Sequence, residues 1–199
     1  MNGPTTDAGR GDLSRTIAAI TPCDPAERAH IDDVLAWIGS GADLFRLAKP
    51  ATPPKHLVAY FQVIDPDTGQ LLLGEHRKAG LLLPNGGHVE PGETLWDTVA
   101  RECREELRIR AEPSPEFGTA PVFVSVTSTR GPGEHVDVSV WHVVHAHRTD
   151  VSYFDADEFT AMRWLTPQEI LAMPTDGLDP CQHRFVRKLA TAAAPGAAR

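Results

Sequence analysis

Three glutamates crowd into one short stretch of the chain, and their spacing indicates a place where chemistry could occur. Glu102, Glu105 and Glu106 are separated by three and four positions, so on an α-helix they lie within an arc of about 100°. Like charges four residues apart destabilise a helix by roughly 0.2–0.5 kcal/mol per pair. Carboxylate oxygens are the ligands that a hard divalent cation such as Mg²⁺ prefers, and the cation commonly shares them with substrate phosphates.

The simpler interpretation of this cluster is a solvated acidic helix face that nearby arginines steady. Two observations favour a metal site. The carboxylates lie beside the expected core face of the helix rather than opposite it, and a Gly-Gly bend and a Glu-Pro-Gly-Glu segment precede them at short range. The expected core-facing residues are Trp96, Val99, Ala100, Cys103 and Leu107, and the arginines are Arg101, Arg104 and Arg108.

The segment from Gly87 to Ile109 has the spacing of a known motif. Five residues separate Gly87 from Glu93, seven separate Glu93 from Arg101, and the segment ends Arg-Glu-Cys-Arg-Glu-Glu-Leu-Arg-Ile. This closely resembles the Nudix box, G-x5-E-x7-R-E-U-x-E-E-x-G-U, where U is a bulky apolar residue. The family's final glycine is Arg108 here, which puts the local turn in question, although a cation suits a helix C-terminus.

Resemblance to the Nudix hydrolases implies Mg²⁺-dependent hydrolysis (Mn²⁺ is an alternative) of a pyrophosphate bond in a nucleoside diphosphate linked to another moiety. Water would attack phosphorus, and a carboxylate would accept its proton. Which glutamate is the general base stays open. The resemblance implies catalytic roles for Glu102, Glu105 and Arg101, metal ligation by the carbonyl of Gly87 and by Glu102, Glu105 and Glu106, and a loop-fixing pair of Glu93 with Arg101.

Outside the box, the acidic segment around residue 157 could add a metal ligand. We prefer Glu158 to its neighbours Asp155 and Asp157, because Glu158 lies near the start of an expected strand; a solvated acidic loop is the alternative. Cationic or polar side chains close to the box could meet substrate phosphate. The candidates for substrate binding are Arg77, Lys78 and His88.

The hydrophobic pattern predicts an α/β or α+β layered fold with an N-terminal helical extension. The resemblance to the Nudix hydrolases implies that this fold is an α+β sandwich with a Nudix-like mixed sheet between helices. Strands are expected at residues 56–65, 70–77, 81–90, 121–130, 135–148 and 161–166, the first two forming a hairpin. Helices are expected at 94–107, 167–172 and 180–193.

Four regions are expected along the chain: a disordered tail (1–12), the helical extension (13–50), a Nudix hydrolase domain (53–190) and a flexible C-terminus (191–199). Within the extension, Asp24, Pro25 and Glu27 read as a helix start, and Gly39 reads as its stop. We expect this extension to pack on the domain.

The 199-residue chain has a net charge of −8, which disfavours non-specific binding to nucleic acid or to an anionic membrane. We expect no signal peptide and no membrane span. Three widely spaced cysteines give neither a disulfide framework nor a metal motif. A cytoplasmic location, a small-molecule nucleotide substrate and a possible homodimer are the remaining expectations.

A non-catalytic Nudix-fold nucleotide sensor is the rival function. Such a protein would usually lose part of the carboxylate set and carry a DNA-binding domain, neither of which the sequence indicates. An isopentenyl diphosphate isomerase of the same fold would need a catalytic cysteine in a recognisable context, which is not found. Ser125 and Thr127 stand where two substrate subgroups carry a proline and a tyrosine, so the sequence does not identify the nucleotide.

Overall fold

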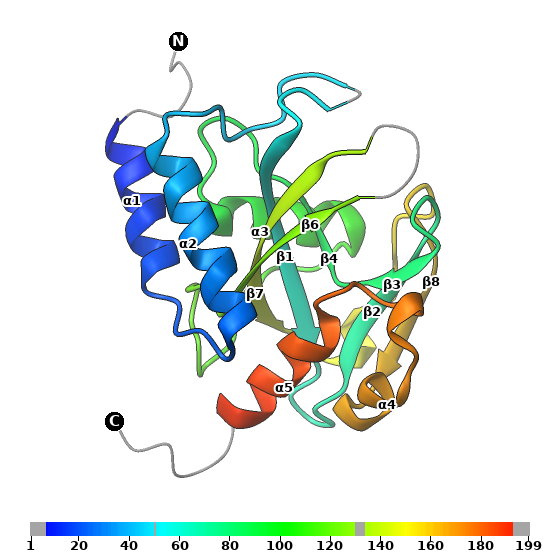
Figure 1. Ribbon diagram of the computed structural model, residues 1–199. Helices are drawn as coiled ribbons and strands as arrows, with labels where there is room; N and C mark the ends of the chain where they lie inside the picture. Colours follow the sequence, from blue (N-terminus) through cyan, green and yellow to red (C-terminus); the bar gives the residue numbers. More distant parts are fainter. Residues whose placement is uncertain (1–6, 50, 130–133, 193–199) are drawn as a thin grey trace.

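The computed structural model describes residues 7–49, 51–129 and 134–192. One eight-stranded sheet forms its centre (Figure 1). Its strands are β1 Lys55–Ile64, β2 Leu71–His76, β3 Leu81–Leu83, β4 Asn85–His88, β5 Glu112–Pro113, β6 Phe123–Ser128, β7 Val136–His145 and β8 Phe159–Leu165. The helices are α1 Asp7–Ala18, α2 Pro25–Gly39, α3 Leu95–Glu106, α4 Pro167–Ala172 and α5 Gln182–Ala192, with 3-10 turns η1 Arg148–Asp150 and η2 Thr175–Gly177.

Strand β1 is the middle of the sheet. It pairs in parallel with β7 along its whole length, from Lys55↔Val136 to Ile64↔His145, and antiparallel with β2 and β4. Strand β6 extends the sheet beyond β7, and β8 extends it beyond β2. The mixed sheet therefore places β1 between β4, which precedes α3 in sequence, and β7, which follows α3.

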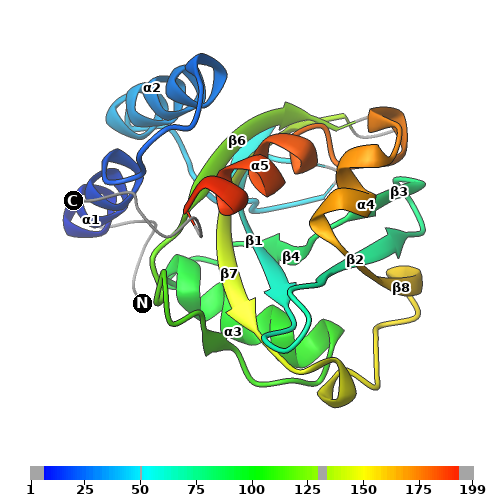
Figure 2. The ribbon, with the colours of Figure 1, turned by 90° about the horizontal axis from the view of Figure 1, so that it is seen from below.

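Alternation along β1 explains why helices cover both faces of the sheet. Leu57, Ala59, Phe61 and Val63 are buried in the same core cluster as residues of α3. On the opposite face, Tyr60 and Ile64 pack with residues of α5. Successive side chains of a strand point to opposite faces. Since both faces of β1 are covered, the strand is apolar nearly throughout. Figure 2 shows α3 and α5 on either side of β1 and β7, and the predicted mixed sheet between helices is confirmed.

The N-terminal helices α1 and α2 lie side by side at the edge of the sheet formed by β6 (Figure 1). Ile31, Val34 and Ile38 of α2 are buried in the core. Two contacts tie the start of α2 to α5. Arg184 binds both carboxylate oxygens of Asp24, at 2.7 and 2.9 Å, and Lys188 donates to the fully buried Glu27 at 2.7 Å.

Three local predictions about the N-terminal part need correction. Asp7 to Asp12 belong to α1, so the expected disordered tail does not hold there; residues 1–6 lie outside the described residues. Helix α2 runs through Gly39 to the C-cap Ser40, and Gly41 has the positive φ of 79°. At the start of α2, Asp24 caps as predicted, but Glu27 accepts from the backbone of Cys23 rather than from that of the cap.

Two further boundaries differ. The segment 81–90 forms two strands, since Pro84 interrupts the pairing and β4 turns onto β1 while β3 stays on β2. The C-terminal residues 191 and 192 belong to α5, and 193–199 lie outside the described residues. Among the residues that are described, no helix is long and apolar enough to cross a membrane.

Replacing Asp24 should test the docking of α2. We expect Asp24→Ala to lower the free energy of unfolding by about 1–2 kcal/mol, because it removes an N-cap. Asp24→Asn keeps a capping oxygen and loses only a partly exposed ion pair, so its loss should be under about 1 kcal/mol. Denaturant unfolding measures both, with Asp33→Ala, which breaks an exposed pair with Lys55, as control. Equal losses for Ala and Asn would show that the cap contributes nothing.

Candidate active site

Helix α3 begins with a capping box that fixes its rotational phase. The hydroxyl of Thr94 accepts from the backbone N–H of Asp97, and the Asp97 carboxylate accepts from the backbone N–H of Thr94. Two orphan N–H groups of the helix start are thereby satisfied. From this start, Val99, Cys103 and Leu107 turn into the core and are at most 1% exposed. The glutamates of the box then lie on the flank of α3 that faces β4.

Strand β4 presents alternate residues to α3. Asn85 and Gly87 pair with Phe61 and Ala59 of β1, which face α3. The side-chain amide of Asn85 donates to Oε2 of Glu106 at 2.9 Å, and the backbone N–H of Gly86 donates to the same oxygen at 3.1 Å. Glu106 is only 2% exposed, so β4 fixes this carboxylate in place.

Asn85 was missed by the sequence reasoning, which read it only as part of a bend. Its burial is complete. A signal was present in principle, because a buried amide beside a glycine pair needs a partner, but nothing in the sequence says that the partner is Glu106, 21 residues away.

Gly87 is required by close approach rather than by backbone conformation. A Cβ added to Gly87 would lie 1.9 Å from Oε1 of Glu102. The carboxylate of Glu102 therefore occupies the space that a side chain at position 87 would need. Its side chain is 12% exposed, which leaves it accessible to a small ligand. Gly87 and Glu102, 15 positions apart in the sequence, are thus brought into contact by the fold.

Arg101 holds the loop against the helix. Its guanidinium binds both carboxylate oxygens of Glu93, at 2.8 and 3.1 Å, and the carbonyl of His88 at 3.0 Å. It also binds Glu102 at 2.7 Å and Glu105 at 3.2 Å. Burial opposes ionisation of Glu93, but the hydrogen bonds from Arg101 and Thr98 outweigh it and lower the pKa of Glu93. Glu93 therefore stays ionised and pairs with Arg101. This is the arrangement expected for a structural ion pair.

Burial and mutual repulsion hold the pKa of two box glutamates above the ordinary range. For Glu106, burial and then the charge of Glu102 raise the pKa well above its usual value, despite hydrogen bonds from Asn85 and Gly86. For Glu102, burial raises the pKa although Arg101 opposes the shift. Glu158 adds to both shifts, so its carboxylate lies close enough to be felt.

This arrangement fits a divalent cation. Oε1 of Glu106 is buried and has no hydrogen-bond partner among the described residues. A buried oxygen of this kind, next to carboxylates that repel one another, lacks a positive charge. A cation would supply that charge and would be held by oxygen atoms alone, which is the ligand set that Mg²⁺ prefers. Glu105 is the most exposed of the three, with 59% of its side chain accessible.

The segment that carries Glu158 is fastened to α3 and to β2. The backbone N–H of Asp155 donates to the carbonyl of Glu106 at 2.8 Å. Arg77 donates from its backbone to the carbonyl of Glu158 at 2.8 Å and from its guanidinium to the carbonyl of Ala156 at 2.6 Å. Arg77 therefore braces the acidic segment. Lys78 is exposed beside it, and the substrate-binding roles of both cations stay predictions.

The ring of His88 does not join the glutamates. His88 pairs with Val58 of β1, whose side chain faces away from α3, and its ring lies 4.8 Å from that of His56. Burial lowers the pKa of His88 to about 3, so the imidazole is neutral. Only the carbonyl of His88 reaches the site, through Arg101. Its position argues against the predicted contact of this ring with substrate.

Arg108 makes the turn that the family motif assigns to glycine. Its φ is 54°, in the left-handed region that costs a non-glycine residue roughly 1–2 kcal/mol. Its guanidinium lies 3.7 Å from the centroid of the Tyr153 ring, and this cation–π contact offsets part of the cost. The chain therefore leaves α3 as the motif requires without the glycine.

The comparisons with known proteins agree with this geometry. The family model described as NUDIX domain matches residues 54–189, which is more than half of the chain, so the chain belongs to the Nudix family. The chain is a Nudix hydrolase, a pyrophosphohydrolase by enzyme class. Members of the Nudix family typically use a divalent metal.

Among individual proteins, the CTP pyrophosphohydrolase of Escherichia coli (strain K12) is 33% identical over 110 residues, covering 53% of this chain and 73% of that protein. The human NAD-capped RNA hydrolase NUDT12 is 27% identical over 122 residues, but the match covers only 24% of its length. The crystal structure of the MutT protein from Methanosarcina mazei Go1 superposes with a TM-score of 0.53 at 21% identity, covering 71% of this chain and 97% of that one. This structural likeness supports the fold alone.

Gly87→Ala should disturb the candidate active site while leaving the fold intact. The added methyl displaces the Glu102 carboxylate, whose flexible end can move, so folding should survive. We expect kcat/KM on the nucleotide that the wild-type chain hydrolyses to fall by about 10²-fold, because small misplacements at an active site cost that much. Gly177→Ala, where no atom lies within 4 Å of the new Cβ, is the control. Full activity of Gly87→Ala would contradict the close approach.

The raised glutamate pKa values predict a pH-dependent response of stability to Mg²⁺. A carboxyl whose pKa is higher in the folded state stabilises fully below its unfolded value, 4.5 for Glu106, and loses that contribution as the pH rises through the folded value. Without divalent cation, we expect Tm to fall between pH 5 and pH 8, and Mg²⁺ to restore roughly 3 °C or more at pH 8.

The matched variant for this measurement is Glu106→Gln, which cannot ionise. Asp179, whose pKa burial raises to about 6, contributes the same trend to both proteins, so the difference between them isolates Glu106. Differential scanning calorimetry across the pH range supplies the data. Identical Tm profiles for wild type and Glu106→Gln would show that Glu106 is not the source of the trend.

Proposed function

We propose that this chain is a Mg²⁺-dependent pyrophosphohydrolase that cleaves a phosphoric anhydride bond of a nucleotide. The observation that carries the proposal is the convergence of two carboxylates on β4. Glu102 lies against Gly87 and Glu106 is bound by Gly86, and the charge of Glu158 acts on both. Family membership supports the reaction class. Mg²⁺ is favoured because every group proposed to hold the metal offers oxygen.

The proposed metal-holding groups are the carbonyl of Gly87 and the carboxylates of Glu102, Glu105, Glu106 and Glu158. Burial and the hydrogen bonds from β4 give Glu106 one fixed orientation, so it is the best-placed anchor of the set. Glu105 is exposed and, within the described part of the chain, is held by Arg101 alone at 3.2 Å, so it can swing toward a ligand. A bound cation of this kind neutralises phosphate charge and acidifies water.

Two residues of this chain are candidates to accept the proton from the attacking water. Glu102 is partly buried with a raised pKa, which suits a general base that works near neutral pH. Glu105 is more accessible. Arg101 touches both carboxylates, so its proposed part is to position whichever group takes the proton and to keep the loop closed on the helix.

Nucleoside triphosphates are the proposed first substrate class. The E. coli relative named for CTP covers most of its own length with this match, whereas the NAD-capped RNA hydrolase shares a quarter of its length. The net charge of −8 suits a small anionic substrate neutralised by a cation better than a long nucleic acid. Because the E. coli relative is named for CTP, cytidine triphosphates are assayed first.

The test is phosphate or pyrophosphate release from a nucleotide panel with and without Mg²⁺. The panel holds the canonical nucleoside triphosphates, oxidised dGTP, ADP-ribose, NADH, a dinucleoside polyphosphate and a nucleotide sugar. We expect metal-dependent turnover, greatest with a nucleoside triphosphate. Glu106→Gln should lower kcat by at least about 10²-fold, because the substitution removes a buried anion while its amide keeps the shape of the side chain.

Glu112→Gln, an exposed glutamate outside the cluster, is the matched control and should leave turnover unchanged. Circular dichroism and Tm confirm that both variants fold. Full turnover in Glu106→Gln would overturn the metal assignment. Nucleotide binding without turnover of any panel member would instead support the ligand sensor.

A further inference from the structure

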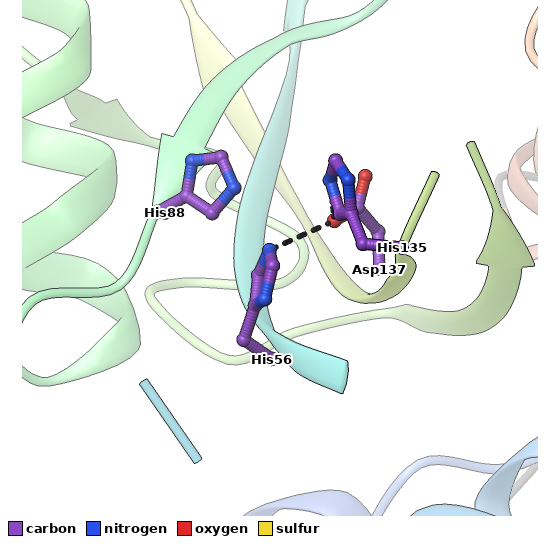
Figure 3. Close-up of side chains that lie close together, drawn as sticks. All are labelled: His56, His88, His135 and Asp137. Carbon is purple, nitrogen blue, oxygen red and sulfur yellow. Dashed lines mark ion pairs between the residues drawn. The ribbon is translucent and has the colours of Figure 1, made fainter. Parts of the chain in front are cut away.

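Three imidazoles and one carboxylate meet at the end of the sheet, away from the glutamates. They are His56, His88, His135 and Asp137, and one ligand atom from each lies within 4.8 Å of the others. Figure 3 shows the four side chains grouped around one point, with His88 and His135 on opposite sides of it. Of these four residues, the sequence pointed only to His88, as a candidate for substrate binding.

Strand pairing explains why residues so far apart converge. His56 lies directly opposite Asp137 in the parallel pair of β1 and β7. His88 lies opposite Val58, two positions along β1, in the antiparallel pair of β1 and β4. His135 precedes Asp137 by two positions. Because side chains two apart in a strand share a face, all four project from the same face, which is the face turned away from Glu102 and Glu106.

The buried atoms of this group lack the proton or cation that they need. Nδ1 of His56 lies 2.9 Å from the carbonyl of Pro53, and a carbonyl only accepts, so Nδ1 carries the hydrogen and Nε2 of the neutral ring is a bare acceptor. That nitrogen faces Oδ1 of Asp137, a second acceptor, at 3.4 Å. Neither atom has a hydrogen-bond partner among the described residues, and the same holds for Nε2 of His88.

Two of the separations between these ligand atoms match those of a tetrahedral metal site. Zinc–nitrogen bonds of about 2.0–2.1 Å place neighbouring ligand atoms about 3.3 Å apart in a tetrahedron. Oδ1 of Asp137 lies 3.4 Å from Nε2 of His56 and 3.2 Å from Nε2 of His135. We propose that His56, His88, His135 and Asp137 bind one Zn²⁺ ion, at a second metal site distinct from the carboxylate cluster. Three imidazoles favour Zn²⁺ over the harder Mg²⁺.

The groups behind the ligands support this assignment. Two of the imidazoles have a partner for the ring nitrogen that points away from the centre: the carbonyl of Pro53 for His56, and the hydroxyl of Thr129 at 3.1 Å for His135. Such partners commonly orient metal-binding histidines. Burial is graded, since the side chain of His56 is fully buried while those of Asp137 and His135 are 13% and 17% exposed. The ion therefore enters past Asp137 and His135.

The site's role is structural. Four protein ligands fill a tetrahedral zinc ion and leave no position for substrate. The ion joins β1, β4 and β7 at the end where the chain passes from β4 into the loop of the Nudix box. Because the carbonyl of His88 accepts from Arg101, clamping His88 steadies the loop that carries Gly87. The proposal does not depend on the substrate or on hydrolysis.

The experiment uses the full chain, stripped with chelator, desalted and given one equivalent of Zn²⁺. We expect one zinc per chain to survive desalting by elemental analysis, and Tm to rise by roughly 5 °C or more. Co²⁺ in place of zinc should give the intense visible absorption of a tetrahedral site. X-ray absorption of the zinc-loaded wild type should show imidazole scattering, a readout that needs no variant.

Variants distinguish the four residues from other zinc-binding groups. Asp137→Asn and His56→Gln should each raise the Zn²⁺ dissociation constant by at least about 10²-fold. His142→Gln removes another buried imidazole from β7, on the opposite face, and should leave it unchanged. The double variant Glu102→Gln/Glu106→Gln removes the carboxylate cluster and should still hold one zinc. Failure of wild type to retain zinc, or retention equal to wild type in both Asp137→Asn and His56→Gln, would overturn the proposal.

Discussion

The candidate active site depends on one partly buried cation, the guanidinium of Arg101. It joins Glu93 near the end of the loop between β4 and α3, the carbonyl of His88 at the end of β4, and two glutamates of α3. A planar fork with several donors can serve these partners at once, which a lysine ammonium cannot. Without Arg101, the loop would lose its main contacts with the helix, and Glu102 would lose the cation that opposes the rise in its pKa. The gathered carboxylates are tolerated because Arg101 and, on our proposal, a divalent cation balance them.

The four residues of strand β4 contribute to two different sites. Its odd positions, Asn85 and Gly87, face α3, where an amide fixes Glu106 and a missing side chain admits Glu102. Its last residue, His88, faces the other side and meets His56. The two-residue period of a strand thus separates an all-oxygen environment from a mainly nitrogen one within a few ångströms of backbone. On our two proposals, each environment selects a different cation by ligand softness.

The motif-bearing part of the chain was predictable because its information is local. Helix α3 and its phase follow from spacing along a single segment, the resemblance to the Nudix box implies the pairing of Arg101 with Glu93, and the structure shows all three. The turn at Arg108 was left in question and is made in the left-handed region with Tyr153 as support. Tyr153 could not be foreseen as that support, since it comes from a loop 45 positions later.

The sequence by itself determined the family, the reaction class and the identity of the clustered glutamates, because a fixed spacing on a helix is enough to place them on one flank. Only the tertiary structure decided what lies behind that flank. Asn85 as the partner of Glu106, the brace from Arg77 to the Glu158 segment, and the group of three histidines with Asp137 all join separate elements. Such contacts depend on strand order and register. The parallel pairing of β1 with β7 sets His56 opposite Asp137, and no periodicity within either strand encodes that pairing.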